Sequence, residues 1–453
     1  MIQYYTLSII GVYLVFLIVI GFVFSKKVSS TESFFLANRN VGVFALTATL
    51  TATVVGGSAT IATGSMIYSR GLPGLWLDIG GGVGLILLGL FLAKIVRKTG
   101  LVTLPQITET FFDKRVRLVS AVLILITQIA WIALLIQGAQ LILQVLLPWN
   151  TDVLLVLITF VFIFYTFLGG QLAVIVTDIV QFIIMIIGVC IIAAPLLFMQ
   201  ALPHFSSINQ SLLHFPVNAS IGLGSAAAFF FMMCMPHLIG PDIYSKVLSA
   251  KDQKSAQHAA IFSGVCKLIF ALSIALIALA AVVLYPGLEN PGLAIPMAVL
   301  GLPTVLAGIL LAAFLSVMLS SADSILISAG TIFSIDLVKK KSVFISRIGI
   351  IVVGCAALVL AIVLQDIIKT LMFAYTIFTA GLTLPILFGF YKNKTHVTSQ
   401  GALWGLILGG SSAMIWLIAG HPFGVDAVLI GMLCSLLPLL IIRVDKKKND
   451  STA

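Results

Sequence analysis

The sequence predicts an all-α membrane protein with about thirteen membrane-spanning helices. Of its 453 residues, 60% are hydrophobic and only 9% are charged, a composition that excludes an ordinary soluble domain or a disordered chain. A helix of ~20 mostly apolar residues is long enough to cross a bilayer. Thirteen apolar segments approach or exceed that length: 4–25, 41–68, 74–95, 117–147, 152–167, 173–199, 221–247, 259–285, 303–337, 343–364, 367–391, 402–418 and 427–442.

Basic residues lie in alternate connections between these segments, and hence on one side of the membrane. The opposite connections carry Arg70 and Lys369. By the positive-inside rule, the N-terminus is outside and the C-terminus cytoplasmic, in a multi-pass protein of the cell (plasma or inner) membrane. The net charge of +10 is therefore a topology signal and not a sign of nucleic-acid binding. The cytoplasmic clusters are Lys26-Lys27, Lys94-Arg97-Lys98-Lys114-Arg115, Lys246-Lys251-Lys254, Lys339-Lys340-Lys341, Lys392-Lys394 and Arg443-Lys446-Lys447-Lys448.

Two segments contain helix breakers near their middle. The second contains Thr53-Val-Val-Gly-Gly-Ser58, and the seventh contains Pro236-His-Leu-Ile-Gly-Pro241. Because they are five segments apart, the second set of five has the opposite topology to the first, as in secondary transporters with inverted repeats. Unwound segments would offer backbone carbonyls to a cation, although packing kinks would produce the same pattern. The expected units are 1–40 (first flanking helix and linker), 41–200 and 201–391 (five helices each), and 392–453 (two helices and a basic tail).

The ninth segment combines hydroxyls with one acid. Such groups are costly in lipid and should face a cavity or the protein interior. They indicate an ion site, or else a tight helix contact of the kind that serines support in membranes. The residues are Ser316, Ser320, Ser321, Asp323, Ser324, Ser328, Thr331 and Ser334.

The chain resembles the sodium:solute symporter family over nearly its whole length. The resemblance rests on five motifs: Thr51–Ser58, Tyr68–Gly71, Leu104–Glu109, Gly169–Gln181, and Ser320–Ser324 leading into Asp336-Leu337. It implies a LeuT-type core of ten helices in two inverted halves, flanked by the first, twelfth and thirteenth segments.

The chain is most similar to the choline-transporter-like and proline-symporter-like branches of that family. Where the choline branch has tryptophans at the two breaks, this chain has Val54 and His237, while Trp131 matches a third aromatic. An aromatic cage for quaternary ammonium is therefore only partly present.

The resemblance also implies a sodium site between the second and ninth segments. Its ligands would be the backbone carbonyls of Ala52, Val55 and Val317 and the hydroxyls of Ser320 and Ser321. Neutral oxygens at a helix break let a hard cation bind and leave. The three residues of the ninth segment share one helix face by their i, i+3 and i+4 spacing.

Three residues are expected to bind the solute: Asp78, Trp131 and His237. An acid inside a membrane is a functional candidate, although Asp78 could also meet water at the interface. A histidine can donate, accept or titrate. Trp131 could form an apolar wall or belong to the core.

Five further polar residues have open roles. Asp323 could strengthen cation binding, titrate a proton, bind a substrate amine, or be a structural acid held by Ser324. Asp178 is expected to organise structure or the inner ion path, and Asp178 and Ser324 join Asp323 as candidates for ion or proton coupling. Lys267 is expected to pair with an acid that the sequence does not identify. Lys246 is interpreted as a cytoplasmic anchor.

These expectations favour a sodium-coupled secondary active symporter that imports a small polar organic solute, possibly amine-bearing or amino-acid-like, by alternating access. A proton-coupled symporter of the same fold, and a transporter-like sensor or sodium-conducting pore, are the alternatives. The sequence shows neither a Walker A motif nor a catalytic triad, so ATP-driven transport on this chain and enzyme activity are not expected. It leaves the solute and the oligomeric state open.

Overall fold

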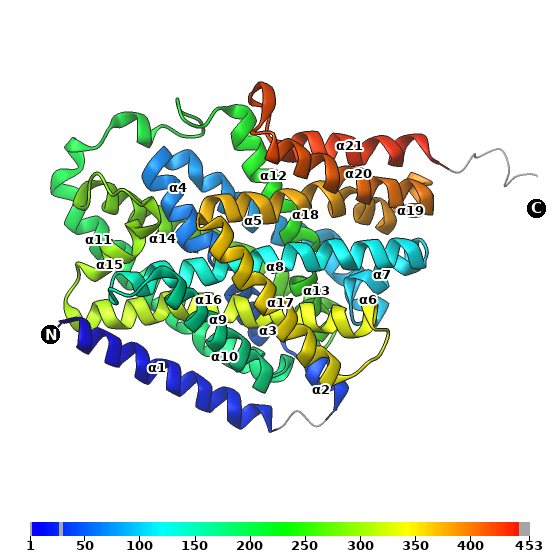
Figure 1. Cartoon of the computed structure of the whole chain (residues 1–453), viewed down its shortest axis with the longest axis horizontal. Helices are drawn as coiled ribbons and strands as arrows, with labels where there is room; N and C mark the ends of the chain where they lie inside the picture. The colour runs from blue at the N-terminus through cyan, green and yellow to red at the C-terminus, as the bar shows by residue number, and fades with distance from the viewer. Residues whose placement is uncertain (1, 27–29, 444–453) are drawn as a thin grey trace, which may run out of the picture.

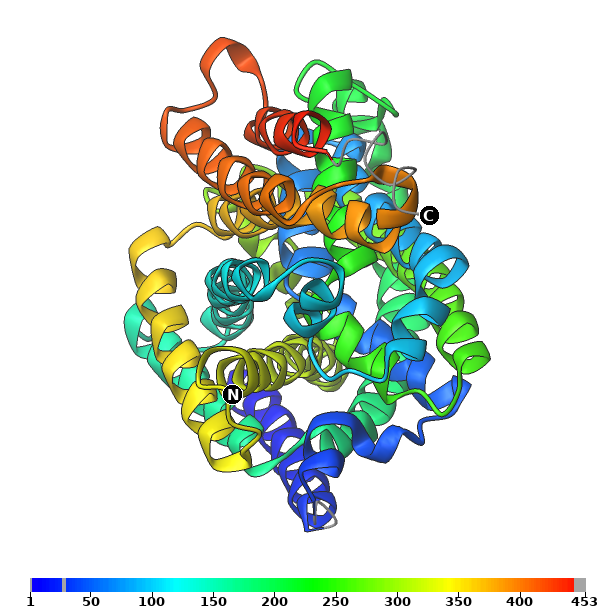
Figure 2. The same ribbon diagram turned by 90° about the vertical axis from the view of Figure 1, so that its right-hand side faces the viewer.

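The computed structural model describes residues 2–26 and 30–443 and is nearly all helical. The long helices run across the view of Figure 1, with the start of α1 at the left and the end of α21 toward the right. Figure 2 shows the same bundle end-on. Lys27 and Lys446–Lys448, which contribute to the predicted topology, lie outside the described residues.

The main helices of the bundle are α1 (Ile2–Ser25), α3 (Val43–Val54), α4 (Thr63–Arg70), α5 (Trp76–Leu87), α6 (Ala93–Thr99), α8 (Lys114–Gln144), α9 (Thr151–Leu168), α10 (Gln171–Met185), α11 (Ala194–Ala201), α12 (Leu223–Ile239), α13 (Pro241–Ser249), α14 (Gln253–Leu284), α16 (Thr304–Ile332), α17 (Val343–Leu364), α18 (Ile367–Phe390), α20 (Ser399–Ile418) and α21 (Ala427–Ile441). Shorter helices lie in the connections: α2 (Thr31–Leu36), α7 (Leu104–Phe111), α15 (Ala294–Leu300) and α19 (Lys392–Thr395).

Eleven helices among the described residues are long and apolar enough to cross a membrane, and the bent pair α3 and Ser58–Arg70 makes twelve. The predicted count of thirteen is not confirmed. The last predicted segment forms α21, which has only 15 residues and falls short of a full crossing of ~20 residues. Large side chains such as Val12 and Leu223 are more than 70% exposed, as expected of a surface that faces lipid.

Both predicted breaks interrupt their helices. α3 ends at Val54, and Val55 leaves the helical conformation at φ −95°, ψ 57°. The chain then resumes as a π-helical turn over Ser58–Ala62 and α4, at 61° to α3. The second break is narrower than predicted, because α12 continues through Pro236 and His237 and only Gly240 is extended, with ψ 138°.

The helices pack in pairs that repeat with an offset of five segments. α5 contacts α14, α8 contacts α16, and α9 contacts α17. The third and eighth segments show this reciprocity: α5 contacts α12 of the seventh segment, and α14 contacts α3 and α4 of the second. The sixth and eleventh segments show it too: α10 contacts α16 of the ninth segment, and α18 contacts α8 of the fourth. Inverted halves require such reciprocal contacts; the residue bounds of the four units stay predictions.

Glycines let α5 approach its neighbours closely. A Cβ on Gly80 or Gly84 would lie 2.3 Å from the carbonyl oxygens of Phe230 and Cys234 in α12. This i, i+4 pair is the small-residue contact by which membrane helices pack without a hydrophobic driving force. The close contact brings α5 and α12 together beside the first break.

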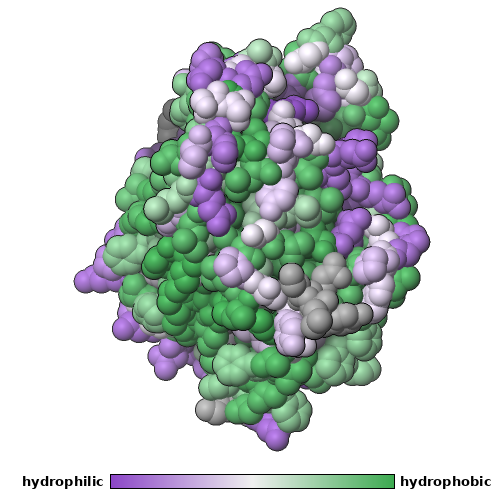
Figure 3. Space-filling view, turned by 90° about the vertical axis from the view of Figure 1, so that its left-hand side faces the viewer, coloured by the Kyte–Doolittle hydropathy of each residue, from purple (hydrophilic) through white to green (hydrophobic). Residues whose placement is uncertain are grey.

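The end of the molecule where α1 begins carries hydrophilic patches next to hydrophobic surface (Figure 3). A cavity of about 460 Å³ lies on the predicted outer side, where α8 ends and α17 meets α18. Its polar lining includes Gln137, Gln140, Gln144, Glu289 and Asp366.

Candidate functional site

The first break and α16 meet through Ser321. Its Oγ donates to the carbonyl oxygen of Thr53 at 2.8 Å and lies 3.3 Å from that of Ala52. These carbonyls belong to the last turn of α3, where no further helical N–H is available to satisfy all of them. A Cβ on Gly56 would lie 2.6 Å from Ser321 Oγ, so glycine permits this approach.

The contact fits a sodium site built from neutral oxygens. Ala52 and Ser321, two of the five predicted ligands, already touch, and Val55 and Val317 are both fully buried. Among the described residues no three His, Cys, Asp or Glu side chains gather into a metal cluster. The complete ligand set stays a prediction.

Ser320, the fifth predicted ligand, turns to a different partner. Its Oγ donates to Asp178 Oδ1 at 2.6 Å. Asp178 also accepts from the hydroxyl of Thr49, and Lys246 Nζ lies 3.0 Å from Asp178 Oδ2. Asp178 therefore connects α10 to α3, α13 and α16.

The interpretation of Lys246 as a cytoplasmic anchor was wrong. Its side chain is fully buried and paired with Asp178. The reason is that α13 does not leave the bundle after the second break but packs against α3 and α16, which directs this lysine inward.

Asp323, unlike Asp178, has no ion pair in the described residues. It is fully buried, and its Oδ2 has no hydrogen-bond partner in the described part of the chain. Its Oδ1 is 3.4 Å from Ser324 Oγ, which lies 3.0 Å from Thr53 Oγ1. These hydroxyls link an acid without a lysine partner to the first break.

A small cavity lies between the two breaks. Its volume is about 40 Å³, room for roughly three water molecules and less than an organic solute requires. Both breaks line it, the first with Thr53–Ser58 residues and the second with His237 and Asp242. Ser321 lines it too, so the predicted sodium site adjoins the cavity.

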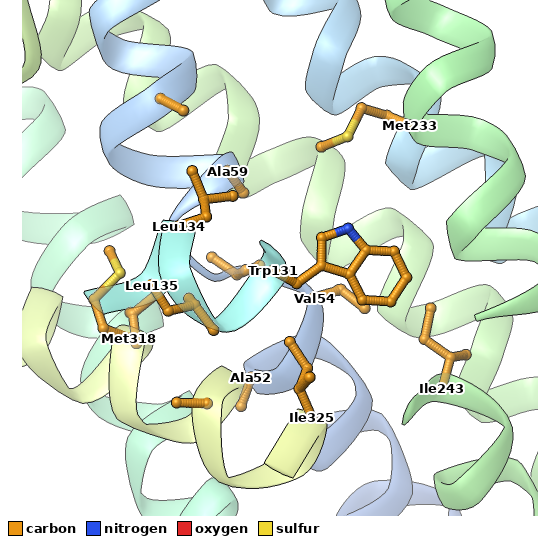
Figure 4. Packing of buried hydrophobic residues seen from close by; sticks show 14 of the residues in the cluster. Ala52, Val54, Ala59, Trp131, Leu134, Leu135, Met233, Ile243, Met318 and Ile325 are labelled. Atoms are coloured by element: carbon orange, nitrogen blue, oxygen red, sulfur yellow. The ribbon is translucent and has the colours of Figure 1, made fainter. Parts of the chain in front are cut away.

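Trp131 and His237, two of the three residues predicted to bind the solute, line this cavity; their contact with a solute stays a prediction. Figure 4 shows the indole of Trp131 among Val54, Met233 and Ile243. Its Nε1 is buried and, within the described residues, has no hydrogen-bond partner. His237 Nδ1 lies 2.7 Å from the carbonyl oxygen of Met233, which can only accept, so Nδ1 donates this hydrogen bond.

Asp78 lies outside the cavity lining. Its Oδ1 is 2.9 Å from Lys267 Nζ, which is also 2.9 Å from the carbonyl oxygen of Val54. The acid that Lys267 was expected to find is thus Asp78. Contact between Asp78 and the solute stays a prediction.

Sequence reasoning missed two residues of the cavity, Asp242 and Tyr375. Asp242 is in the first turn of α13 directly after Gly240-Pro241, so its place beside the second break could have identified it. Tyr375 packs on Trp131 with 5.3 Å between ring centroids, and its hydroxyl donates to Ser58 Oγ at 3.3 Å. No pattern in the sequence distinguished it from the other apolar residues of its segment.

Comparison with known proteins agrees with this architecture. The model of the sodium:solute symporter family matches residues 34–409. The chain is 26% identical to the high-affinity choline transporter 1 of Caenorhabditis elegans, covering 94% of this chain and 80% of the relative. It is also 26% identical to the sodium/proline symporter of Staphylococcus aureus, with 98% and 93% covered.

Solved structures show the same fold. A Na+-coupled sialic acid symporter in a substrate-bound outward-open state superposes with a TM-score of 0.79, at 20% identity and 97% coverage of both chains. MhsT in complex with L-phenylalanine superposes with a TM-score of 0.60, at 11% identity, covering 89% of this chain and 98% of that one.

Proposed function

Because the chain belongs to the sodium:solute symporter family and is a multi-pass, sodium-coupled symporter of a small organic solute, we propose that its solute carries a positively charged nitrogen and binds between the two helix breaks. The observation that carries this proposal is the position of Asp242. Asp242 is an acid of the cavity lining without an ion pair in the described residues, whereas the carboxylates of Asp78 and Asp178 are each paired with a lysine.

The rest of the cavity suits such a solute. Trp131 and Tyr375 pack against each other at one wall and offer π-faces, which attract cations and cover apolar groups. His237 adds a polar ring to the same lining. The choline transporter and proline symporter to which the chain is similar are named for solutes that also contain a positively charged nitrogen.

Sodium and solute would be coupled through the first break. The same segment supplies the carbonyls of Ala52 and Thr53 to Ser321 and lines the cavity. Sodium bound there would order the wall that the solute touches, so each ligand would raise the affinity of the other. With a membrane potential of ~100 mV, one sodium charge contributes ~2.3 kcal/mol, enough to concentrate a neutral solute about 50-fold.

Access would alternate around this cavity. The cavity on the predicted outer side and the cavity between the breaks both include residues of α8, so a path from outside would run along that helix. The small volume between the breaks, about 40 Å³, favours a carrier over a continuously open pore.

The second candidate is proton coupling through Asp323 or His237. It is favoured by one observation, the buried Oδ2 of Asp323 without a partner in the described residues, because an unpaired acid inside a membrane protein is a candidate for a proton relay. Proteoliposomes separate the two. Radiolabelled choline, proline and small primary amines are offered under an inward sodium gradient or an inward proton gradient. The proposal expects uptake of at least one amine with sodium; uptake with the proton gradient alone would favour the alternative.

A further inference from the structure

Two lysines are buried in the core beside the first break. Lys246 and Lys267 are at most 1% exposed. Each pairs with an aspartate from the other predicted half of the core: Lys246 of α13 with Asp178 of α10, and Lys267 of α14 with Asp78 of α5. A charged lysine is rare at such a depth unless it has a partner or a function.

Lys246 completes the contacts of Asp178. Oδ1 of this carboxylate accepts from Ser320, and Oδ2 accepts from Thr49 and from Lys246 at 3.0 Å. Ser320 is a predicted sodium ligand, so without the ammonium the same place would offer a cation one carboxylate and two hydroxyls. The ammonium already occupies the position that a second ion would need.

The Lys267 ammonium also occupies a position that a cation could take, next to the end of α3. Its Nζ lies 2.9 Å from both Asp78 Oδ1 and the carbonyl oxygen of Val54. Val54 is the last residue of α3, where the helix dipole is negative and favours a cation. A carboxylate and a helix-end carbonyl would otherwise form a further cation site.

We propose that the Lys246 and Lys267 ammonium groups are tethered cations that fill these two positions, so that a single mobile sodium ion accompanies each solute. The inference rests on the proposed function. A second sodium ion could bind Asp178 only by displacing Lys246, which would leave a buried lysine without its partner, an arrangement that is strongly unfavourable. Asp323, linked to the break through Ser324 and Thr53, is the core acid left to balance the mobile ion.

The number of bound sodium ions tests this directly, with a readout that needs no solute. Equilibrium binding of ²²Na+ to the purified full-length protein is measured at saturating sodium and pH 8 for the wild type, Lys246→Met and Lys267→Met. Methionine keeps the unbranched shape of lysine without its charge. Lys251→Met, which removes an exposed lysine of the α13–α14 connection, is the matched control. The double variant Asp178→Asn with Lys246→Met removes both charges of one pair.

The expected result is about one ion per chain for the wild type, the control and the double variant, and about two, a twofold rise, for each single lysine variant. Two ions on the wild type would overturn the inference and leave sodium coupling intact; none would overturn sodium coupling itself. A folded Lys246→Met that still binds one ion would also overturn the inference. If one lysine variant fails to fold, the other and the double variant decide.

Discussion

Ser321 Oγ donates to the carbonyl oxygen of Thr53 at 2.8 Å, joining the centre of α16 to the point where α3 unwinds. Ser321 also lines the cavity between the two breaks. An ion that competes for these oxygens would therefore reorganise a wall of this cavity. This shared contact is the basis of the proposed coupling between ion and solute.

Ser321→Ala should weaken sodium binding. The substitution removes one hydroxyl oxygen at the break and leaves the helix intact, because alanine has high helix propensity. Loss of a polar contact to a buried partner costs ~1–3 kcal/mol, so the half-maximal sodium concentration should rise by about 5- to 150-fold. Thermal stabilisation of the purified protein by sodium measures this concentration, and Ser320→Ala should raise it as well. Thr331→Ala is the control, since this hydroxyl bonds to Ile327 of its own helix. Wild-type sodium dependence in the Ser320→Ala, Ser321→Ala double variant would place the site elsewhere.

Asp242→Asn should reduce affinity for an amine solute without unfolding the protein. The amide keeps the size of the side chain and removes the charge that the solute nitrogen would meet. Loss of a desolvated charge partner typically costs 2–5 kcal/mol, or at least ~30-fold in affinity. Solute binding is measured at saturating sodium by isothermal titration. Unchanged affinity of Asp242→Asn for the solute would rule out this carboxylate as its partner.

Asp78→Asn should destabilise the protein and leave its affinity for the solute largely unchanged. Here the substitution leaves Lys267 buried without a carboxylate, and breaking one partner of a buried pair costs ~3–5 kcal/mol. The thermal midpoint should fall clearly, and the Asp78→Asn, Lys267→Met double variant should recover part of the loss. A stable Asp78→Asn protein with much weaker solute binding would instead support the direct solute contact that the sequence suggested.

The predicted topology can be checked by labelling single cysteines from each side of the membrane. Ser220 precedes α12 on the predicted outer side, and Lys254 lies in the first turn of α14 on the inner side; both are exposed. In a background without Cys190, Cys234, Cys266, Cys355 and Cys434, an impermeant maleimide on right-side-out vesicles should modify Ser220→Cys and spare Lys254→Cys. Modification of both from one side would contradict the inverted arrangement.

Glycine and proline made the breaks predictable from the sequence. These residues permit an unwound backbone locally, so Gly56 and Gly240 revealed where helices would end. The positions of Lys246 and Asp242 were not predictable in the same way. In a membrane protein both faces of a helix are apolar, so hydrophobic periodicity does not show which face is inside. Lys246 and Asp178 are 68 residues apart, and only the tertiary packing of α13 brings them together.

The central claim, that sodium and an amine-bearing solute bind together, is tested most directly by thermal unfolding of the purified protein with a panel of small amines and their uncharged analogues. Each compound is measured in sodium chloride and in potassium chloride at equal ionic strength. A bound solute stabilises by about 2.7 kcal/mol at 100 times its Kd. We expect at least one amine, and not its uncharged analogue, to raise the unfolding temperature in sodium and much less in potassium. Equal stabilisation in both salts, or no amine that stabilises the protein in sodium, would contradict the claim that sodium and an amine-bearing solute bind together.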